Sequence, residues 1–320
     1  MIDRIKFEIK GVSLEHFITI EDKLGFDDAG LHGKERVAIK STTYRNIRFK
    51  YFAVYKLLTI EGSLHKFCKG NNYGDFTYAE MKTVLIELSE MVDIHLSRFH
   101  VTKMEIGVNA RMKEAPTEYL DMLHSYKSRP FIDMTPLAKK SALRGKRCKF
   151  VEYEIKFYDK TFDAIYRDKH RKETVPENIL RYELALSRKY LKAIGMTNVT
   201  GKNLLSCLHF LRFKELLRSM LDAIYCNDFT ASFETLTPDE VKYYIFVMSS
   251  DYRRYLAYLK KYRGEKEYRK EARRGNILKK KVAPLKEGAL EREFKSEMLH
   301  ALDRNCRFYP PIESWISSTM

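Results

Sequence analysis

Four side chains of the types that perform phosphoryl transfer lie in strand-like segments of the first half of the chain. They are Glu105 in VTKMEIGVNA, Tyr158 in KFVEYEIKFYDK, and Arg181 and Glu183 in NILRYELAL. Apolar and polar residues alternate in all three segments, and successive side chains of a strand point to opposite faces. The alternation therefore predicts that these four side chains share one polar face of a sheet.

Such a set suits phosphodiester transfer by a tyrosine. Glu105 and Glu183 could hold a hard cation such as Mg²⁺ or Mn²⁺, which takes its remaining ligands from water and phosphate. The cation would polarise the phosphoryl oxygen while the oxygen of Tyr158 attacks phosphorus. Arg181 could bind phosphate bidentately and lower the phenol's pKa from about 10. Alternation alone also fits a solvated sheet face with no chemistry.

The elements that must position these residues read as strands separated by helices. Alternation in residues 1–10 and 44–56 predicts two half-buried antiparallel strands. Apolar residues spaced three and four apart predict an amphipathic helix from Thr77 to about residue 99. Residues 115–128 read as a helix that opens on a proline, and the 20 or so residues after it read as a basic loop.

After about residue 195 the pattern changes to helices, and Thr237 to Glu240 forms a capping-box-like start for one of them. The predicted fold class is α+β: an antiparallel sheet with helices on one face, followed by a mainly helical domain. Two related sheet units within the first part are an open alternative. We place a catalytic α+β domain at residues 1–195 and a helical DNA-binding domain at residues 196–320.

The charge of the chain indicates a polyanionic partner. Its 59 Lys and Arg against 43 Asp and Glu give a net charge of +16, which suits nucleic acid or an anionic membrane. Residues 252–282 alone hold 13 Lys and Arg against 3 Glu. No run of about 18 apolar residues occurs, and the charged start MIDRIKFEIK does not suit a signal peptide. We therefore expect a soluble, non-secreted protein without a membrane partner.

Cysteine and histidine usage restricts the metal chemistry. The 5 Cys residues are dispersed without a CxxC pair, and the 9 His residues include no HExxH and no HxH. A reducing compartment fits this cysteine pattern best. Any metal would therefore have to lie mainly on carboxylates.

The sequence resembles the rolling-circle replication initiators of small plasmids and filamentous phages, including the phage gene II and X type and the staphylococcal plasmid type. The resemblance rests on the order and spacing of MIDRIKFEI, VTKMEIGVN, FYDK and LRYELALS. It covers about residues 1–200, and more loosely the helical region that follows. The His-hydrophobe-His metal site of the better-known HUH initiators does not occur in this sequence.

Initiators of this family nick one strand at the replication origin and become linked to the 5′ phosphate through a tyrosine, which frees a 3′ hydroxyl for replication. The resemblance thus implies a metal-dependent, site-specific DNA endonuclease and strand transferase. It implies that Tyr158 is the nucleophile, that Lys160 helps with phosphate, and that Arg181 and Glu183 are the basic and acidic partners of an Arg-x-Glu strand. Glu105 stands where many relatives carry Asp, as a metal ligand.

A second candidate nucleophile is Tyr166, eight residues after Tyr158 on a predicted short helix. Helix amphipathicity explains this tyrosine nearly as well. The identity of the nucleophile therefore stays open between the two positions.

The resemblance implies origin DNA as the partner, supercoiled or single-stranded at the nick site, in the cytoplasm of a bacterial host. A host helicase and polymerase are candidate further partners, and a homodimer is left open. Origin binding should fall on basic side chains because Lys and Arg neutralise phosphates. The candidate contacts are Lys146 and Arg147 in the basic loop and Arg253, Arg254, Lys260, Lys261, Arg269, Lys270, Arg273 and Arg274 in the helical domain.

Two other functions remain open. A non-catalytic DNA- or RNA-binding protein would use the basic helices and leave the sheet acids solvated. A tyrosine recombinase is suggested by LHFLR at residues 208–212, which mimics the His-x-x-Arg box of that family. No preceding Arg box of that family occurs in the sequence, and its catalytic domain is mainly helical, whereas the acids here lie on predicted strands.

Overall fold

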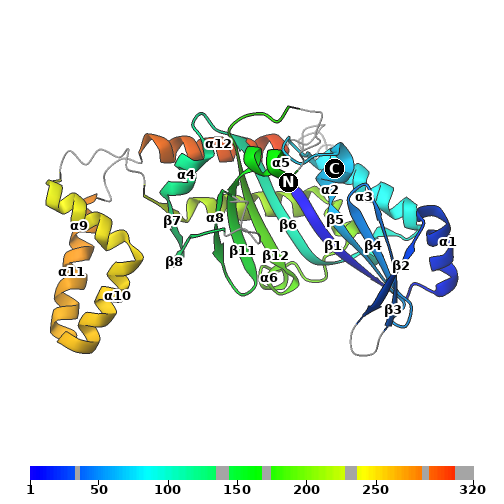
Figure 1. Cartoon of the computed structure of the whole chain (residues 1–320), viewed down its shortest axis with the longest axis horizontal. Helices are drawn as coiled ribbons and strands as arrows, with labels where there is room; N and C mark the ends of the chain where they lie inside the picture. Colours follow the sequence, from blue (N-terminus) through cyan, green and yellow to red (C-terminus); the bar gives the residue numbers. More distant parts are fainter. Residues whose placement is uncertain (33–36, 135–143, 168–173, 228–235, 283–287, 307–320) are drawn as a thin grey trace, which may run out of the picture.

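The computed structural model contains a large antiparallel sheet with helices on one face (Figure 1). The structure describes residues 1–32, 37–134, 144–167, 174–227, 236–282 and 288–306. Ten strands form the main sheet in the order β2-β3-β4-β5-β1-β6-β12-β11-β10-β9, and a small sheet has the order β13-β7-β8. The predicted α+β class, with a helical region after the sheet, is confirmed.

The elements have the following bounds. The strands are β1 (Ile2–Lys10), β2 (Asp27–His32), β3 (Val37–Tyr44), β4 (Ile47–Phe52), β5 (Leu57–Ser63), β6 (His100–Arg111), β7 (Leu123–Tyr126), β8 (Arg129–Pro130), β9 (Ile132–Asp133), β10 (Gly145–Lys149), β11 (Tyr153–Asp159), β12 (Ile179–Ser187) and β13 (Ile224–Cys226). The helices are α1 (Leu14–Leu24), α2 (Leu64–Lys69), α3 (Tyr78–Val92), η1 (Leu96–Arg98), α4 (Pro116–Met122), α5 (Lys160–Arg167), α6 (Arg188–Ala193), α7 (Gly201–Leu204), α8 (Cys207–Asp222), α9 (Pro238–Met248), α10 (Ser250–Tyr258), the π-helical η2 (Leu259–Arg263), α11 (Glu265–Val282) and α12 (Ala289–Asn305).

The main sheet consists of two halves with the same topology. β1 and β6 pair antiparallel at its centre. Outward from β1 lie β5, β4, β3 and β2, and outward from β6 lie β12, β11, β10 and β9. In each half, the strand beside the central one, β5 or β12, leads into a short helix. The N-cap of this helix is a serine, Ser63 for α2 and Ser187 for α6. The alternative of two related sheet units is therefore the one that the topology supports.

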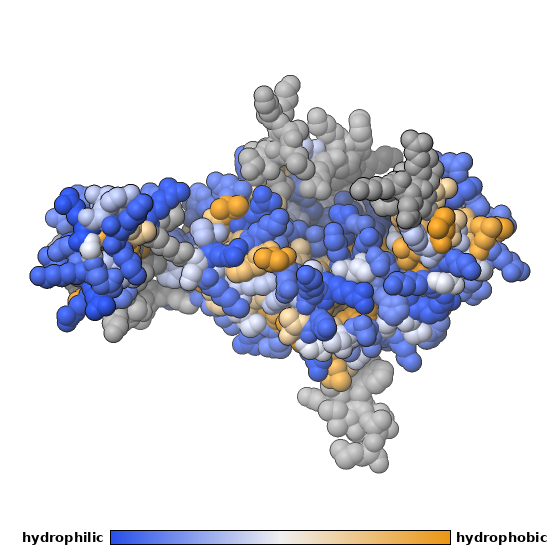
Figure 2. All heavy atoms as spheres, turned by 90° about the horizontal axis from the view of Figure 1, so that it is seen from below, coloured by the Kyte–Doolittle hydropathy of each residue, from blue (hydrophilic) through white to orange (hydrophobic). Residues whose placement is uncertain are grey.

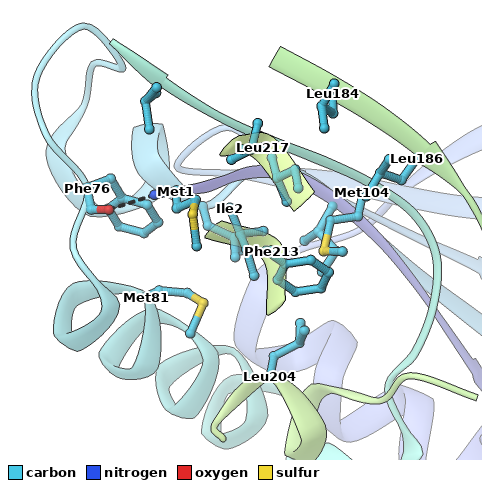
Figure 3. Close-up of a cluster of buried hydrophobic side chains, with 14 of the residues drawn as sticks. Met1, Ile2, Phe76, Met81, Met104, Leu184, Leu186, Leu204, Phe213 and Leu217 are labelled. Atoms are coloured by element: carbon cyan, nitrogen blue, oxygen red, sulfur yellow. Dashed lines mark hydrogen bonds between the residues drawn. The ribbon is translucent and has the colours of Figure 1, made fainter. Parts of the chain in front are cut away.

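Helices cover the apolar face of the sheet. Figure 3 shows Met81 of α3 and Phe213 of α8 packed against strand residues such as Ile2 and Met104. At the other half, the ring of Phe157 on β11 stacks on a neighbouring strand tyrosine and lies 5.5 Å from the ring of α12 residue Phe294. These helices bury the face on which the alternating apolar residues of the strands lie.

The helices after residue 195 divide into two groups. α8 and α12 contribute to the same core as the sheet. α9, α10 and α11 pack among themselves, with Leu236 and Leu278 in a separate small core, and they stand apart from the sheet at the left of Figure 1. A hydrogen bond of 2.6 Å joins the hydroxyls of Tyr225 on β13 and Tyr244 on α9. The packing therefore sets α9, α10 and α11 apart as a separate unit. The sequence pattern had predicted a single domain boundary at residue 195.

The sequence pattern predicted correctly where two helices begin, but it placed the ends of two helices too far along the chain. Thr77 and Thr237 both form the capping boxes that their sequences indicate. The first of these helices ends at Val92, because Asp93 adopts a left-handed conformation with φ of 50°. The predicted helix over residues 115–128 ends at Met122 and continues as β7.

The predicted basic loop also holds the short strands β8, β9 and β10. Lys146 and Arg147 lie on β10, which pairs with β11. A short strand of mainly polar residues has no clear alternation of its own, so its pairing with a neighbouring strand cannot be predicted from its sequence. Among the described residues, no helix combines the length and apolar character that crossing a membrane requires.

Candidate active site on the polar face of the sheet

The register of three strands brings the predicted residues together. Lys156 of β11 lies opposite Glu183 of β12, which in turn lies opposite Gly107 of β6. Opposite residues of neighbouring strands share a face, as do residues two apart along a strand. Tyr158 and Glu105 therefore lie on the same face as Glu183, as the alternation predicts.

Gly107 lets β6 and β12 approach at this point. A Cβ atom at Gly107 would lie 2.3 Å from the carbonyl oxygen of Tyr182 and 2.9 Å from Cγ of Glu183. A side chain here would therefore push away the strand that carries Glu183.

These side chains line a pocket of about 420 Å³ to which both halves of the sheet contribute. The second half supplies Glu105, Lys156, Tyr158, Lys160 and Glu183, and the first half supplies Asp3, Arg4, Arg48, Lys66 and Asn72. The whole lining contains five Lys and Arg and, with Glu61 and Asp163, also five Asp and Glu, so its formal charges balance. A ligand that carries phosphate has to compete with these carboxylates for the cations.

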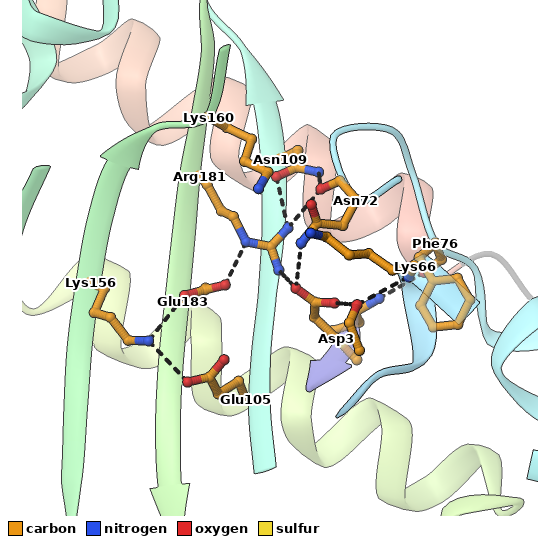
Figure 4. Close-up of polar contacts among 12 residues, drawn as sticks. Asp3, Lys66, Asn72, Phe76, Glu105, Asn109, Lys156, Lys160, Arg181 and Glu183 are labelled. Atoms are coloured by element: carbon orange, nitrogen blue, oxygen red, sulfur yellow. Dashed lines mark hydrogen bonds and ion pairs between the residues drawn. The ribbon is translucent and has the colours of Figure 1, made fainter. Parts of the chain in front are cut away.

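The guanidinium of Arg181 joins three strands beneath the pocket (Figure 4). Its Nη2 donates to Oδ2 of Asp3 at 2.6 Å, its Nη1 to Oδ1 of Asn109 at 2.9 Å, and its Nε to Oε1 of Glu183 at 2.6 Å. Arg181 is only 2% exposed, and Nη1 also donates to the Asn72 carbonyl at 3.3 Å. These donors point at protein groups, so the geometry does not support the predicted bidentate contact with phosphate.

The hydroxyl of Tyr158 points at a carboxylate. It donates to Oε1 of Glu183 at 3.2 Å, and the tyrosine is 8% exposed. Burial and the charge of Glu183 raise the phenol's pKa well above 10, and the opposing effect of Arg181 is smaller. Arg181 does lower this pKa, as predicted, but burial and Glu183 outweigh it and the net shift is upward.

Glu183 is held in its ionised form. Burial by itself would raise its pKa, but the charges of Arg181 and Lys156 keep the pKa below its usual value. A carboxylate that accepts a hydrogen bond from a protonated phenol has the arrangement of a general base.

Lys156 lies between the two carboxylates that were predicted to hold a metal ion. Its Nζ is 3.0 Å from Oε1 of Glu105 and 3.2 Å from Oε2 of Glu183. Burial and the charge of Glu183 raise the pKa of Glu105. Among the described residues, no three His, Cys, Asp or Glu side chains are grouped to hold a metal ion. In this arrangement the pair does not fit a divalent cation, because the ammonium group would have to move first.

Lys160 lies beside the phenol on the first turn of α5. Its Nζ is 2.8 Å from Oδ2 of Asp163 and 5.7 Å from the centre of the Tyr158 ring. Burial and the nearby charge of Arg181 lower the pKa of Lys160. A buried ammonium with a lowered pKa can both attract phosphate and give up a proton.

Other candidates lie outside the pocket. The exposed ring of Tyr166 on α5 stacks on Phe162 at 6.1 Å and does not line the pocket. Arg147 lies on the polar face opposite Lys156, and Lys146 lies on the other face of β10. Six of the helical-domain candidates are exposed on α10, η2 and α11: Arg254, Lys260, Lys261, Arg269, Lys270 and Arg273. Arg274 is exposed there too and lies over the ring of Tyr243, while the side chain of Arg253 lies outside the described part.

Sequence reasoning missed Asp3, which is central to the site. Asp3 has the same parity as Ile5, Phe7 and Ile9, so alternation assigns it to the buried apolar face. The register of β1 against β6 shifts between Ile2 and Arg4, and this bulge changes the face. The sequence did contain one sign of this role: an acidic residue at a position of β1 where the alternation predicts an apolar side chain.

Comparisons with known proteins identify no family. No protein-family model matches the chain, and no curated protein sequence matches it. Among solved structures, the di-domain ARO/CYC BexL from the BE-7585A biosynthetic pathway is 7% identical, with a TM-score of 0.19, over 69% of this chain and 94% of that chain. A TM-score this low carries no argument about fold or function.

The buried ion pair predicts a large effect of Asp3→Asn on stability. The change leaves the Arg181 guanidinium without its carboxylate, so we expect the free energy of unfolding in urea to fall by about 3–5 kcal/mol. Glu61→Gln, in the exposed Arg4–Glu61 pair, should cost less than about 1 kcal/mol. Equal effects of the two substitutions would contradict the role given to Arg181.

The same ion pair predicts how stability responds to acid. Burial opposes ionisation of Asp3, but Arg181 and the hydrogen bond from Ser63 lower its pKa from 3.8 to about 2. Because the folded pKa is depressed, the stabilisation is present above about pH 4 and is lost as the pH falls towards 2. The urea midpoint of Asp3→Asn should therefore fall less steeply over this range than that of the unmodified protein.

Lys156→Gln should tighten the binding of Mn²⁺ to the full-length protein by about ten-fold, because the competing ammonium is removed. Electron paramagnetic resonance of free Mn²⁺ measures this affinity. Glu105→Gln in the same background should abolish the gain, and Lys103→Gln, an exposed lysine on β6, is the matched control. If Lys156→Gln and Lys103→Gln behave alike, the predicted metal site on Glu105 and Glu183 is wrong.

Proposed function

We propose that this protein nicks one strand of DNA by attack of Tyr158 on a phosphodiester, as an initiator of rolling-circle replication. The observation that carries the proposal is the hydrogen bond from the Tyr158 hydroxyl to the ionised Glu183 carboxylate. A buried tyrosine usually finds an acceptor, but this one lies at a pocket whose lining includes five Lys and Arg side chains beside five Asp and Glu. The pocket thus offers a nucleophile, its base and a place for phosphate together.

Each group has a defined part in the proposed step. Glu183 accepts the phenolic proton as the oxygen of Tyr158 forms its bond to phosphorus. The bond between phosphorus and the 3′ oxygen breaks, and Lys160 supplies the proton that the leaving oxygen takes up. The products are a 5′-phosphotyrosyl link and a free 3′ hydroxyl. Attack by a 3′ hydroxyl on this link reverses the step and returns the strand, which accounts for strand transfer.

Arg181 acts as a positioning residue in this proposal. Its bonds to Asp3 and Asn109 fix the guanidinium, and its bond to Glu183 fixes the base. The phosphate contacts then fall to Arg4, Arg48 and Lys66, which line the pocket from the first half of the sheet. No step requires a divalent cation at Glu105 and Glu183, and the predicted use of Mg²⁺ or Mn²⁺ is tested separately by the Mn²⁺ titration.

The two alternative functions differ in what they leave unexplained. The recombinase-like segment LHFLR lies on α8, which packs on the apolar face of the sheet, and none of its residues lines the pocket. A passive nucleic-acid binder would account for the basic helices but not for the pairing of Tyr158 with Glu183. Origin DNA, a host helicase and polymerase, and a homodimer remain parts of the proposal that depend on nicking.

Identification of the DNA-bearing residue tests the nucleophile. Single-stranded oligonucleotides of random sequence, labelled at the 3′ end, keep the label on the protein if the 5′ phosphate becomes linked. We expect the adduct on Tyr158, and Tyr158→Phe should lower its yield at least about a thousand-fold. Tyr166→Phe is the control and should retain the adduct. Loss in Tyr166→Phe with retention in Tyr158→Phe would move the nucleophile to α5.

The lowered pKa of Lys160 predicts the alkaline side of the pH profile. Besides burial, the groups that set this pKa are Arg181, Asp163 and Asp3. Lys160 donates its proton only below its pKa, so nicking in the presence of Mg²⁺ should decline as the pH rises towards 10.5. Lys160→Arg should lower the nicking rate about a hundred-fold and remove this decline, because guanidinium keeps its charge but does not give up its proton over this range. An unchanged alkaline limb in that variant would show that another group is the acid.

A further inference from the structure

Three tyrosines form an exposed row on the basic helical unit. Tyr255 and Tyr258 on α10 and Tyr262 on η2 are 38%, 46% and 63% exposed. Their spacing of three and four residues places them on one side of the helix. The ring centres of Tyr258 and Tyr262 are 5.2 Å apart. We refer to these three residues as the tyrosine strip.

Packing within the unit does not account for the strip. Its interior uses other aromatic residues: Tyr252 is 5% exposed and donates to the Glu271 carbonyl, and Tyr243 donates to the Glu271 carboxylate. Tyr255 touches Phe246, with ring centres 5.7 Å apart. The outer faces of the strip remain in solvent, where large aromatic surface is unfavourable unless a ligand uses it.

Cations surround the strip. Nζ of Lys261 lies 4.9 Å from the ring centre of Tyr262, and Arg254, Lys260 and Arg263 are exposed nearby in the sequence. Figure 2 shows the unit, at its left, as mainly hydrophilic. Residues 252–282 carry a net charge of +10. A ligand that matches both features has flat π faces and regularly spaced negative charges.

We propose that the tyrosine strip binds single-stranded nucleic acid, with bases stacked on its rings and phosphates held by the flanking Lys and Arg side chains. In a duplex the base faces cover one another, so only a single strand offers them to tyrosine. This inference does not rest on nicking by Tyr158.

An anionic membrane is the competing partner for a basic, aromatic surface. Among the described residues of the unit, the other exposed large hydrophobic side chains are Ile245 and Ile277. These lie on α9 and α11 and not on the helix that carries the strip. The strip thus offers little aliphatic surface for insertion into acyl chains, which favours nucleic acid.

Binding of fluorescent oligo(dT) of 20 nucleotides to the full-length protein tests the proposal by anisotropy. All variants carry Tyr158→Phe, so that no covalent adduct forms and a failure of the nicking proposal leaves this test intact. Replacing the three strip tyrosines by Ala should weaken oligo(dT) binding by about a thousand-fold, since each stacked base contributes about ten-fold and these factors multiply. Replacing them by Phe should change it less than about three-fold. Ile245→Ala with Ile277→Ala is the matched control and should leave binding unchanged.

Three outcomes would overturn the proposal. Unchanged oligo(dT) binding in the triple Ala variant, with its helix content intact by circular dichroism, would show that charge alone binds. An equal loss for a hairpin duplex of the same length would remove the preference for single strands. Unchanged oligo(dT) binding with loss of binding to phosphatidylserine vesicles would assign the strip to membranes. If the triple variant unfolds, Tyr262→Ala alone should weaken oligo(dT) binding about ten-fold, and no change would overturn the proposal.

Discussion

The buried positive charge of Arg181 is the constraint on which the pocket depends. A guanidinium removed from water is tolerated only when its charge and its donors are satisfied. Asp3, Asn109 and Glu183 do this from three neighbouring strands. The requirement fixes the rotamer of Glu183 and keeps this carboxylate ionised, which makes it an acceptor for the phenol of Tyr158. The chemistry of the tyrosine is thus set by a residue that does not reach the pocket.

The two halves of the sheet differ at the positions that carry this charge. When the two halves are aligned on their N-cap residues Ser63 and Ser187, Arg181 corresponds to Leu57 and Glu183 to Thr59. The first half therefore lacks the ionised pair at the equivalent strand. Instead, it contributes Asp3, which reaches Arg181 across the β1–β6 junction, and the pocket residues Arg4, Arg48 and Lys66. The two halves of the sheet therefore line one pocket with different residues.

The sequence predicted the faces of strands but not their neighbours. Alternation is a local property, and it correctly put Glu105, Tyr158 and Glu183 on one face. The bulge that turns Asp3 towards Arg181 depends on pairing between β1 and β6, which no local pattern contains. The position of Lys156 between the carboxylates of Glu105 and Glu183 likewise depends on which strands are neighbours in the sheet. The resemblance named Arg181 together with Glu183, but not its other partners Asp3 and Asn109.

The cations of this chain lie in two different settings, one paired with carboxylates and one exposed to solvent. Lys156 and Lys160 in the pocket and Arg181 beneath it are paired with carboxylates at 2.6–3.2 Å. Such pairing shifts pKa values and weakens the attraction of these cations for any polyanion. Residues 252–282 hold +10 of the net charge of +16, largely exposed, where it attracts phosphates but is screened by salt. The proposed function therefore assigns DNA binding to the basic helices and the transfer step to the pocket.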